Sequence, residues 1–183
     1  MTPEQTGLWD GPYVHPLKMD DAEYAEFLKK VRRGLGAYNA ATLMGVGTYG
    51  KPIEIYNKFV DMSEPFEVTP FMERGRELED DALDLFAKTT GLTIEPMEGG
   101  DMFLRHPDNK FLVCQIDARV AADGKVVPTD WGPGLCDAKV PANFFFKSYV
   151  SRGISEHDYL QMQWCLGLAD LRWGTFAVLD YEG

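Results

Sequence analysis

Residues 135–140 (LCDAKV) place an acid, Asp137, two positions before an amine, Lys139. In an extended strand alternate side chains share a face, so these two point one way while Cys136 and Ala138 point the other. A carboxylate that can bind a metal ion, beside an amine that can handle a proton or stabilise charge, suits metal-assisted hydrolysis of a phosphodiester. More often the same spacing marks only a solvated strand face with a minor ion pair. The chemical interpretation therefore depends on the residues that accompany this pair.

A second acid, Asp117, lies in a segment that we expect to neighbour the Asp137 strand. Residues 111–120 alternate between apolar and polar side chains, which predicts a strand. Asp117 falls on the polar face of this strand, opposite the apolar residues Cys114, Ile116, Ala118 and Val120.

A third acid, Glu79, lies on the longest predicted helix, residues 71–90, which Gly91 closes as a C-cap. Glu79 shares a face of this helix with the apolar residues Ala82, Leu83 and Phe86. The opposite, solvent face carries Glu77, Asp80, Asp81 and Asp84. A carboxylate carried towards a core is costly unless it meets a cation or a hydrogen-bond donor. An acid at the edge of an apolar stripe is more often a rim residue than a ligand, so both interpretations stay open.

The chain begins with an irregular arm, residues 1–19, which is interrupted by prolines and glycines. Asp20 or Asp21 can cap a helix that ends basic, as a helix C-terminus prefers. Gly34 and Gly36 then form a turn that leads into a helix of small residues. Such a turn suits either the close approach of a phosphate to backbone amides or the tight packing of the small-residue helix.

The remaining elements complete an α/β pattern with a central mixed sheet flanked by helices. Residues 143–149 are aromatic and basic; such a run is more often core, but it could stack on nucleic-acid bases. His106 precedes a Pro-Asp-Asn turn, where a lone histidine is usually structural. The strands after Gly91 are predicted to form an antiparallel meander that feeds the Asp137 strand. The further helices and strands are predicted at residues 52–59, 92–95, 102–106, 159–168 and 172–181.

Length and composition bound the class of protein. The chain of 183 residues, 45% hydrophobic, is expected to form a single domain over residues 1–183. No membrane span or signal peptide is expected, which predicts a cytoplasmic protein. Three cysteines without a C-x-x-C spacing argue against a disulfide framework or a zinc knuckle. The net charge of −11 argues against a general nucleic-acid coat protein but is compatible with a nuclease that has metal-binding carboxylates.

The motifs, taken in order, resemble the PD-(D/E)XK nucleases, and within them the lambda exonuclease/YqaJ-like viral recombinase group. The resemblance runs over nearly the whole chain, from about Arg32 to Tyr181, and implies a restriction-endonuclease-like core. Residues 33–41 (RGLGAYNAA) are similar to the group's R-x-G-I-G-A-S-D-A-A motif. The other matching pieces are residues 75–82 (GRELEDDA), Asp117, residues 137–139 (DAK) and residues 159–163 (YLQMQ).

The resemblance implies a role for each matching residue. One or two Mg²⁺ or Mn²⁺ ions would be held by three carboxylates and one backbone carbonyl: those of Glu79, Asp117, Asp137 and Ala138. Lys139 would orient or help to deprotonate the attacking water and offset charge in the transition state, and Gln161 would position Lys139, the water or the phosphate. The residues implied to hold a DNA phosphate near the 5′ end are Arg32 or Arg33 with the turn at Gly34 and Gly36.

The sequence departs from the family pattern at three positions. Tyr38 stands where the family has a serine, Ile116 where a proline usually precedes the acid, and Asp137 where glutamate is commoner. The bulky phenol of Tyr38 cannot simply replace a small hydroxyl that contacts a terminal phosphate.

The leading hypothesis is a Mg²⁺-dependent exonuclease that degrades duplex DNA from its ends, 5′ to 3′. In phage-type recombination in a bacterial host, such an enzyme supplies single strands to an annealing protein. The resemblance leaves open a homo-oligomer. Two alternatives keep the fold: a structure-selective endonuclease, or a noncatalytic member that binds DNA ends or a protein partner.

Overall fold

The computed structural model describes residues 34–46, 50–60, 69–96, 102–109 and 111–180, which form two compact units. The first unit draws on Met1–Glu64, Met97–Ile116 and Glu156–Asp170. The second draws on Pro65–Pro96, Asp117–Ser155 and Leu171–Gly183. Each unit takes segments from separate parts of the chain, so the two are not consecutive domains. The single domain over residues 1–183 stays a prediction, and the predicted arm and first helix lie outside the described residues.

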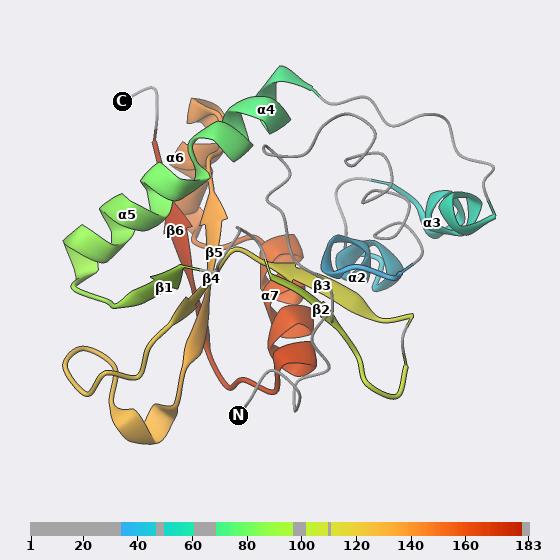
Figure 1. Ribbon diagram of the computed structural model, residues 1–183. Coiled ribbons are helices and arrows are strands. Elements are labelled where there is room, and N and C mark those ends of the chain that lie inside the picture. The colour runs from blue at the N-terminus through green and yellow to red at the C-terminus, as the bar shows by residue number, and fades with distance from the viewer. Residues whose placement is uncertain (1–33, 47–49, 61–68, 97–101, 110, 181–183) are drawn as a thin grey trace. The chain divides into compact units, whose positions relative to one another are not determined.

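The second unit is built on a four-stranded mixed sheet (Figure 1). The strand order is β1-β4-β5-β6, with antiparallel β1–β4 and β4–β5 pairs and a parallel β5–β6 pair. The mixed sheet confirms the predicted α/β class. The strands are β1 (Ile94–Pro96), β4 (Ala118–Val120), β5 (Gly134–Lys139) and β6 (Gly174–Val178). The helices of this unit are α4 (Pro70–Glu77), α5 (Glu79–Thr90) and α6 (Asn143–Arg152), and it also contains a short 3-10 helix, η3 (Thr129–Trp131).

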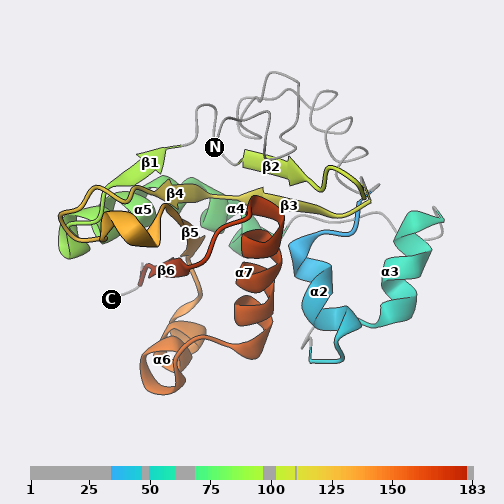
Figure 2. The same ribbon diagram turned by 90° about the horizontal axis from the view of Figure 1, so that it is seen from below.

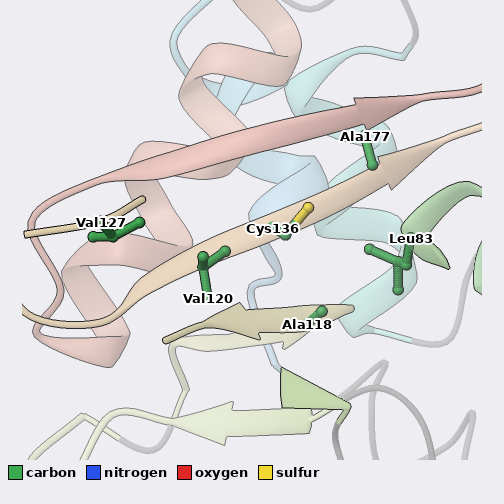
Figure 3. Close-up of a cluster of buried hydrophobic side chains, with 6 residues drawn as sticks. All are labelled: Leu83, Ala118, Val120, Val127, Cys136 and Ala177. Carbon is green, nitrogen blue, oxygen red and sulfur yellow. The ribbon is translucent and has the colours of Figure 1, made fainter. Parts of the chain in front are cut away.

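Helix α5 covers one face of this sheet through a small apolar core (Figure 3). Leu83 extends from α5 towards the strands, where it meets Cys136 of β5 and Ala177 of β6. The same buried cluster contains Ala118 and Val120 of β4, together with Val127. Because most of these side chains are small, α5 can pack closely on the strands that carry the candidate site.

The first unit is an antiparallel strand pair packed with helices (Figure 2). Helix α7 packs against α2 and against β3, and the Trp164 indole of α7 donates a hydrogen bond to the Val113 carbonyl at 2.8 Å. Small buried side chains of α2, at Ala37, Ala40 and Ala41, allow the close approach of α7. The elements of this unit are β2 (Met102–Arg105), β3 (Val113–Ile116), α2 (Ala37–Leu43), α3 (Pro52–Phe59) and α7 (Glu156–Ala169).

The predicted helix over residues 71–90 is wrong as one element, because it is broken at Leu78 into α4 and α5. Leu78 has φ −104° and ψ 4°, which ends one helix and starts the next. The break puts three acids, Glu79, Asp80 and Asp81, in the first turn of α5, where the helix dipole favours negative charge. Gly91 closes α5 with φ 73°, as the sequence predicted.

The prediction of one strand over residues 111–120 is also wrong, because a bend at Asp117 divides it into β3 and β4. The predicted meander fails with it, since β1 pairs with β4 while β2 pairs with β3 in a separate two-stranded sheet. The predicted alternation of buried and polar residues nevertheless holds across the bend.

Candidate active site

Strand β5 carries an ion pair on one face and core residues on the other. Lys139 Nζ lies 2.7 Å from Asp137 Oδ2, and the side chains of Lys139 and Asp137 are 21% and 15% exposed. Cys136, which immediately precedes Asp137, is 1% exposed and belongs to the core under α5. The predicted separation of a polar from an apolar face on this strand is therefore confirmed.

Asp117 lies at the bend that precedes β4, where the ladder between β4 and β5 ends. Its Oδ2 accepts a hydrogen bond at 2.8 Å from the backbone amide of Ala138, which lies beyond the last residue of β5 that pairs with β4. Ala118 is paired with Cys136 in the last pair of this ladder, so Asp117 adjoins the end of β5 that carries Asp137. The hydrogen bond to the Ala138 amide therefore holds the Asp117 carboxylate beside the segment of β5 that carries Asp137 and Lys139.

The backbone of Ala138 adds a third oxygen to this region. Within a strand the N–H and C=O of one residue point to the same side, as the exchange of both bonds in an antiparallel pair requires. Because the Ala138 amide reaches Asp117, the Ala138 carbonyl also points towards the Asp117 side of β5. On the opposite side, the Lys139 carbonyl accepts a hydrogen bond from the Leu179 amide at 2.9 Å.

The buried thiol of Cys136 is influenced by both carboxylates. Burial is the largest cause that raises its pKa, from 9.0 to about 12, and the negative charges of Asp137 and Asp117 contribute in the same direction. Both charges therefore act on the Cys136 thiol of β5, which agrees with the hydrogen bond that holds Asp117 beside this strand.

Glu79 is the first residue of α5 and is partly exposed. Leu83, one turn further along α5, packs on the Cys136 face of the sheet, whereas Asp137 and Lys139 occupy the other face. Among the described residues, no group of three or more His, Cys, Asp or Glu side chains is arranged to hold a metal ion. The structure thus brings together Asp117, Asp137, Ala138 and Lys139, and the participation of Glu79 stays a prediction.

The oxygen donors that do come together fit a hard divalent cation. Mg²⁺ is commonly held by one or two carboxylates, with water and substrate phosphate completing its octahedron, rather than by an all-protein cage. Asp117, Asp137 and the Ala138 carbonyl supply donors of this kind. A cation at Asp137 would compete with Lys139 for the same carboxylate, so its arrival would free the amine for other contacts.

The residues implied to hold DNA phosphate belong to the first unit or lie outside the described residues. Arg32 and Arg33 fall outside them. At Gly34 a Cβ would come within 2.5 Å of Val113 Cγ2, so this glycine permits close packing on β3. At Gly36 a Cβ would meet nothing within 4 Å, and the Leu35 amide between the glycines donates to the Phe111 carbonyl at 2.7 Å. Packing explains Gly34, and phosphate contact at either glycine stays a prediction.

Helix α7 carries Gln161, which is partly buried in the first unit, so its predicted contact with Lys139 stays a prediction. The same helix also holds a pair that sequence reasoning overlooked. The side chains of His157 and Asp158 are 12% and 11% exposed, with Nδ1 and Oδ1 3.8 Å apart. The His157 ring meets Tyr38 edge to face at 5.0 Å between centroids. The unusual Tyr38 of the glycine motif was the one signal that could have pointed to this contact.

His106 has the structural role that its position suggests. Its Nδ1 accepts hydrogen bonds from the amides of Asp108 and Asn109, at 3.2 Å and 3.0 Å. These contacts organise the turn between β2 and β3.

Two solved structures share this fold. One is LHK-Exo in complex with dAMP, with a TM-score of 0.65, 19% identity, and coverage of 86% of this chain and 75% of that chain. The other is an alkaline exonuclease, LHK-Exo, from Laribacter hongkongensis, with a TM-score of 0.64, 17% identity, and coverage of 87% and 75%. The fold is therefore the restriction-endonuclease-like α/β fold that the sequence predicted.

The family follows from a match over most of the chain. The family of the YqaJ-like viral recombinase domain matches residues 26–172, and the chain belongs to this family. A search of curated proteins found no match. Among the residues that the structure describes, none of the helices has the length and apolar character needed to cross a bilayer.

Proposed function

We propose that this protein is a divalent-metal-dependent deoxyribonuclease that hydrolyses phosphodiester bonds at the ends of duplex DNA. The observation that carries the proposal is the Asp137–Lys139 pair on β5, with Asp117 bonded to the intervening Ala138 amide. Membership of the YqaJ-like family and the fold shared with an alkaline exonuclease support a phage-type nuclease.

The metal, when bound, would polarise the phosphate and supply a nucleophile from water at neutral pH. Asp117, Asp137 and the Ala138 carbonyl would hold it, with Glu79 as a further ligand. Asp117 is fixed for this task by the Ala138 amide, which orients its carboxylate relative to the strand. A ligand held by the backbone loses less conformational freedom when it binds than a mobile surface acid would lose.

Lys139 would act on the reacting groups. Its amine lies against Asp137 and is largely shielded from solvent, so it remains positioned at the carboxylate that binds the metal. Once released from Asp137, the ammonium would hold the attacking water or stabilise the negative charge that grows on the phosphate oxygens. Gln161 would position Lys139, the water or the phosphate, and Arg32 or Arg33 would hold the terminal phosphate with Gly34 and Gly36.

The finer proposal is an exonuclease with 5′ to 3′ polarity that prepares single strands for an annealing protein. A structure-selective endonuclease is the second candidate, because Tyr38, the residue that replaces the family serine, packs on His157. A terminal-phosphate site built around a small hydroxyl would therefore be altered in this chain.

The test is degradation of DNA labelled at either the 5′ or the 3′ end, with Mg²⁺ or Mn²⁺ and with EDTA as control. We expect loss of linear duplex that begins at the 5′ end, with covalently closed circles left intact. Lys139→Ala should abolish the loss, while Lys125→Ala, at an exposed lysine of the same unit, should not. Cleavage of circles would favour the endonuclease, and intact DNA under every metal condition would refute both.

A further inference from the structure

Helix α6 is an exposed helix that the proposed mechanism does not use. None of its ten residues is buried, and Phe144, Phe145 and Val150 are 79%, 49% and 75% exposed. Figure 2 shows the helix extending away from the sheet of its unit. The sequence left open whether this phenylalanine run is core or stacks on nucleic-acid bases. Phe144 and Phe145 are exposed rather than buried in a core, so their rings need another explanation.

The charge of α6 differs from that of its surroundings. The chain carries a net charge of −11, yet residues 138–155 contain no acid and three bases, Lys139, Lys147 and Arg152. Among the helices described, α6 alone has more basic than acidic residues. An acidic protein that binds a polyanion must concentrate its cations where the ligand lies, because nonspecific affinity for DNA comes from local Lys and Arg.

Aromatic and basic side chains alternate around the exposed face of the helix. Lys147 lies three residues after Phe144, and Arg152 lies seven residues after Phe145, so each ring has a cation on its own side. The two rings meet edge to face at 5.5 Å between centroids and 81° between planes, which turns their faces in different directions. Proteins that bind single-stranded nucleic acid with little sequence preference stack bases on aromatic rings and contact phosphates with nearby cations. Helix α6 has both kinds of side chain.

Helix α6 lies close to the candidate active site along the chain. Phe144 follows Lys139 by five residues in the same unit, and five residues of extended chain span at most about 18 Å. That distance is the length of about five stacked nucleotides of one strand. A DNA strand that meets Lys139 could therefore reach Phe144 without leaving this unit.

We infer that α6 is a binding site for single-stranded DNA, in which Phe144 and Phe145 stack on bases and Lys147 and Arg152 contact phosphates. The inference rests on the proposed function, since it takes DNA as the ligand of this chain. It adds a site for an unpaired strand next to the site of hydrolysis. A duplex end that enters would have its terminal bases held apart by the rings.

Binding is measured without cleavage, by fluorescence anisotropy of a fluorescein-labelled thymidine 15-mer in EDTA. We expect Phe144→Ala to weaken binding about tenfold, within the range typical of one stacked base. The matched control is Val150→Ala, which removes an equally exposed apolar group of the same helix that cannot stack. Circular dichroism should show both variants folded, because exposed substitutions change stability little.

The cations are tested by the salt dependence of the same binding. Lys147→Ala with Arg152→Ala should make the slope of log K against log salt shallower by about 1.4, the value for two single-strand phosphates. The control pair Lys125→Ala with Arg172→Ala, two exposed cations of the same unit, should leave the slope unchanged.

Unchanged affinity of Phe144→Ala for the 15-mer would overturn the inference. Conversion of an oligomeric wild type to a monomer by Phe144→Ala, with binding of the 15-mer retained, would also overturn it and assign α6 to a second copy of the chain. If the wild type degrades linear duplex while Phe144→Ala binds the 15-mer normally, the single-strand site on α6 is refuted and the proposed nuclease function stands. If α6 binds the 15-mer but the protein degrades no DNA, the proposed function fails and α6 stays a single-strand site.

Discussion

Asp117 has a structural role in the fold and a proposed chemical role in metal binding, and two substitutions separate the two roles. Asp117→Ala removes the acceptor of the Ala138 amide, a partly buried hydrogen bond of 2.8 Å to a charged group. Hydrogen bonds to charged groups contribute about 1.5–3 kcal/mol to stability, and losing the acceptor leaves the amide to be satisfied by water. Asp117→Asn keeps an acceptor oxygen and nearly the same volume, so most of that stability should remain.

The expected magnitudes follow from chain length. For a protein of this size, 1 kcal/mol corresponds to about 2–4 °C in Tm, so Asp117→Ala should melt about 3–12 °C lower than wild type. Asp117→Asn should melt within about 3 °C of it. Both variants should lose metal-dependent cleavage, since an amide binds a divalent cation far more weakly than a carboxylate. The measurement is thermal melting without metal, beside the end-labelled duplex assay.

The outcome that refutes this reasoning is specific. Equal destabilisation by asparagine and alanine would mean that the charge, rather than the acceptor, matters to the fold. Normal cleavage by Asp117→Asn would mean that the carboxylate does not take part in the chemistry. In either case the two roles assigned to Asp117 would have to be revised.

Two further predictions concern packing and pH. Gly34→Ala should lower the free energy of unfolding by about 1–3 kcal/mol, because the added Cβ would overlap Val113. The control is Gly36→Ala, which should leave this free energy unchanged because nothing lies within 4 Å of its Cβ. Urea denaturation measures both variants. Equal stability of the two variants would contradict the packing role of Gly34. For Cys136, the folded pKa of about 12 lies above the ordinary 9.0, so the unfolded chain releases this proton first as pH rises. The contribution of the neutral Cys136 thiol to the free energy of unfolding is therefore greatest below pH 9. It should fall by about 1.4 kcal/mol per pH unit between pH 9 and 12. The difference in unfolding free energy between wild type and Cys136→Ala should therefore shrink over that window, and a constant difference would contradict the assignment.

Local periodicity predicted the polar and apolar faces of β5 because strand alternation depends only on the chain itself. The faces assigned to Asp137 and Cys136 are correct, and so is the proximity of Asp117 to that strand. The α/β class and the Gly91 cap followed from equally local signals. These features need no knowledge of distant partners.

Features that depend on distant contacts were not predictable in this way. The break at Leu78 and the bend at Asp117 each interrupt a pattern that continues on both sides, so periodicity alone predicts one continuous element in each case. The pairing of β1 with β4 joins segments far apart in the chain. The apolar run at Phe144 shows hydrophobicity but not whether another element covers it, and here the ring is exposed.

The central claim is that Asp117 and Asp137 hold a divalent cation, and thermal melting with added Mn²⁺ measures it most directly. Binding to the folded state alone stabilises by about 2.7 kcal/mol at a hundredfold excess over Kd, or about 5–11 °C in Tm for this chain length. We predict this rise for wild type and its loss in Asp137→Asn, with Asp80→Asn, an exposed acid of the same unit, as the control that keeps it. An equal rise in wild type and Asp137→Asn would contradict the account, because the cation would then be bound elsewhere.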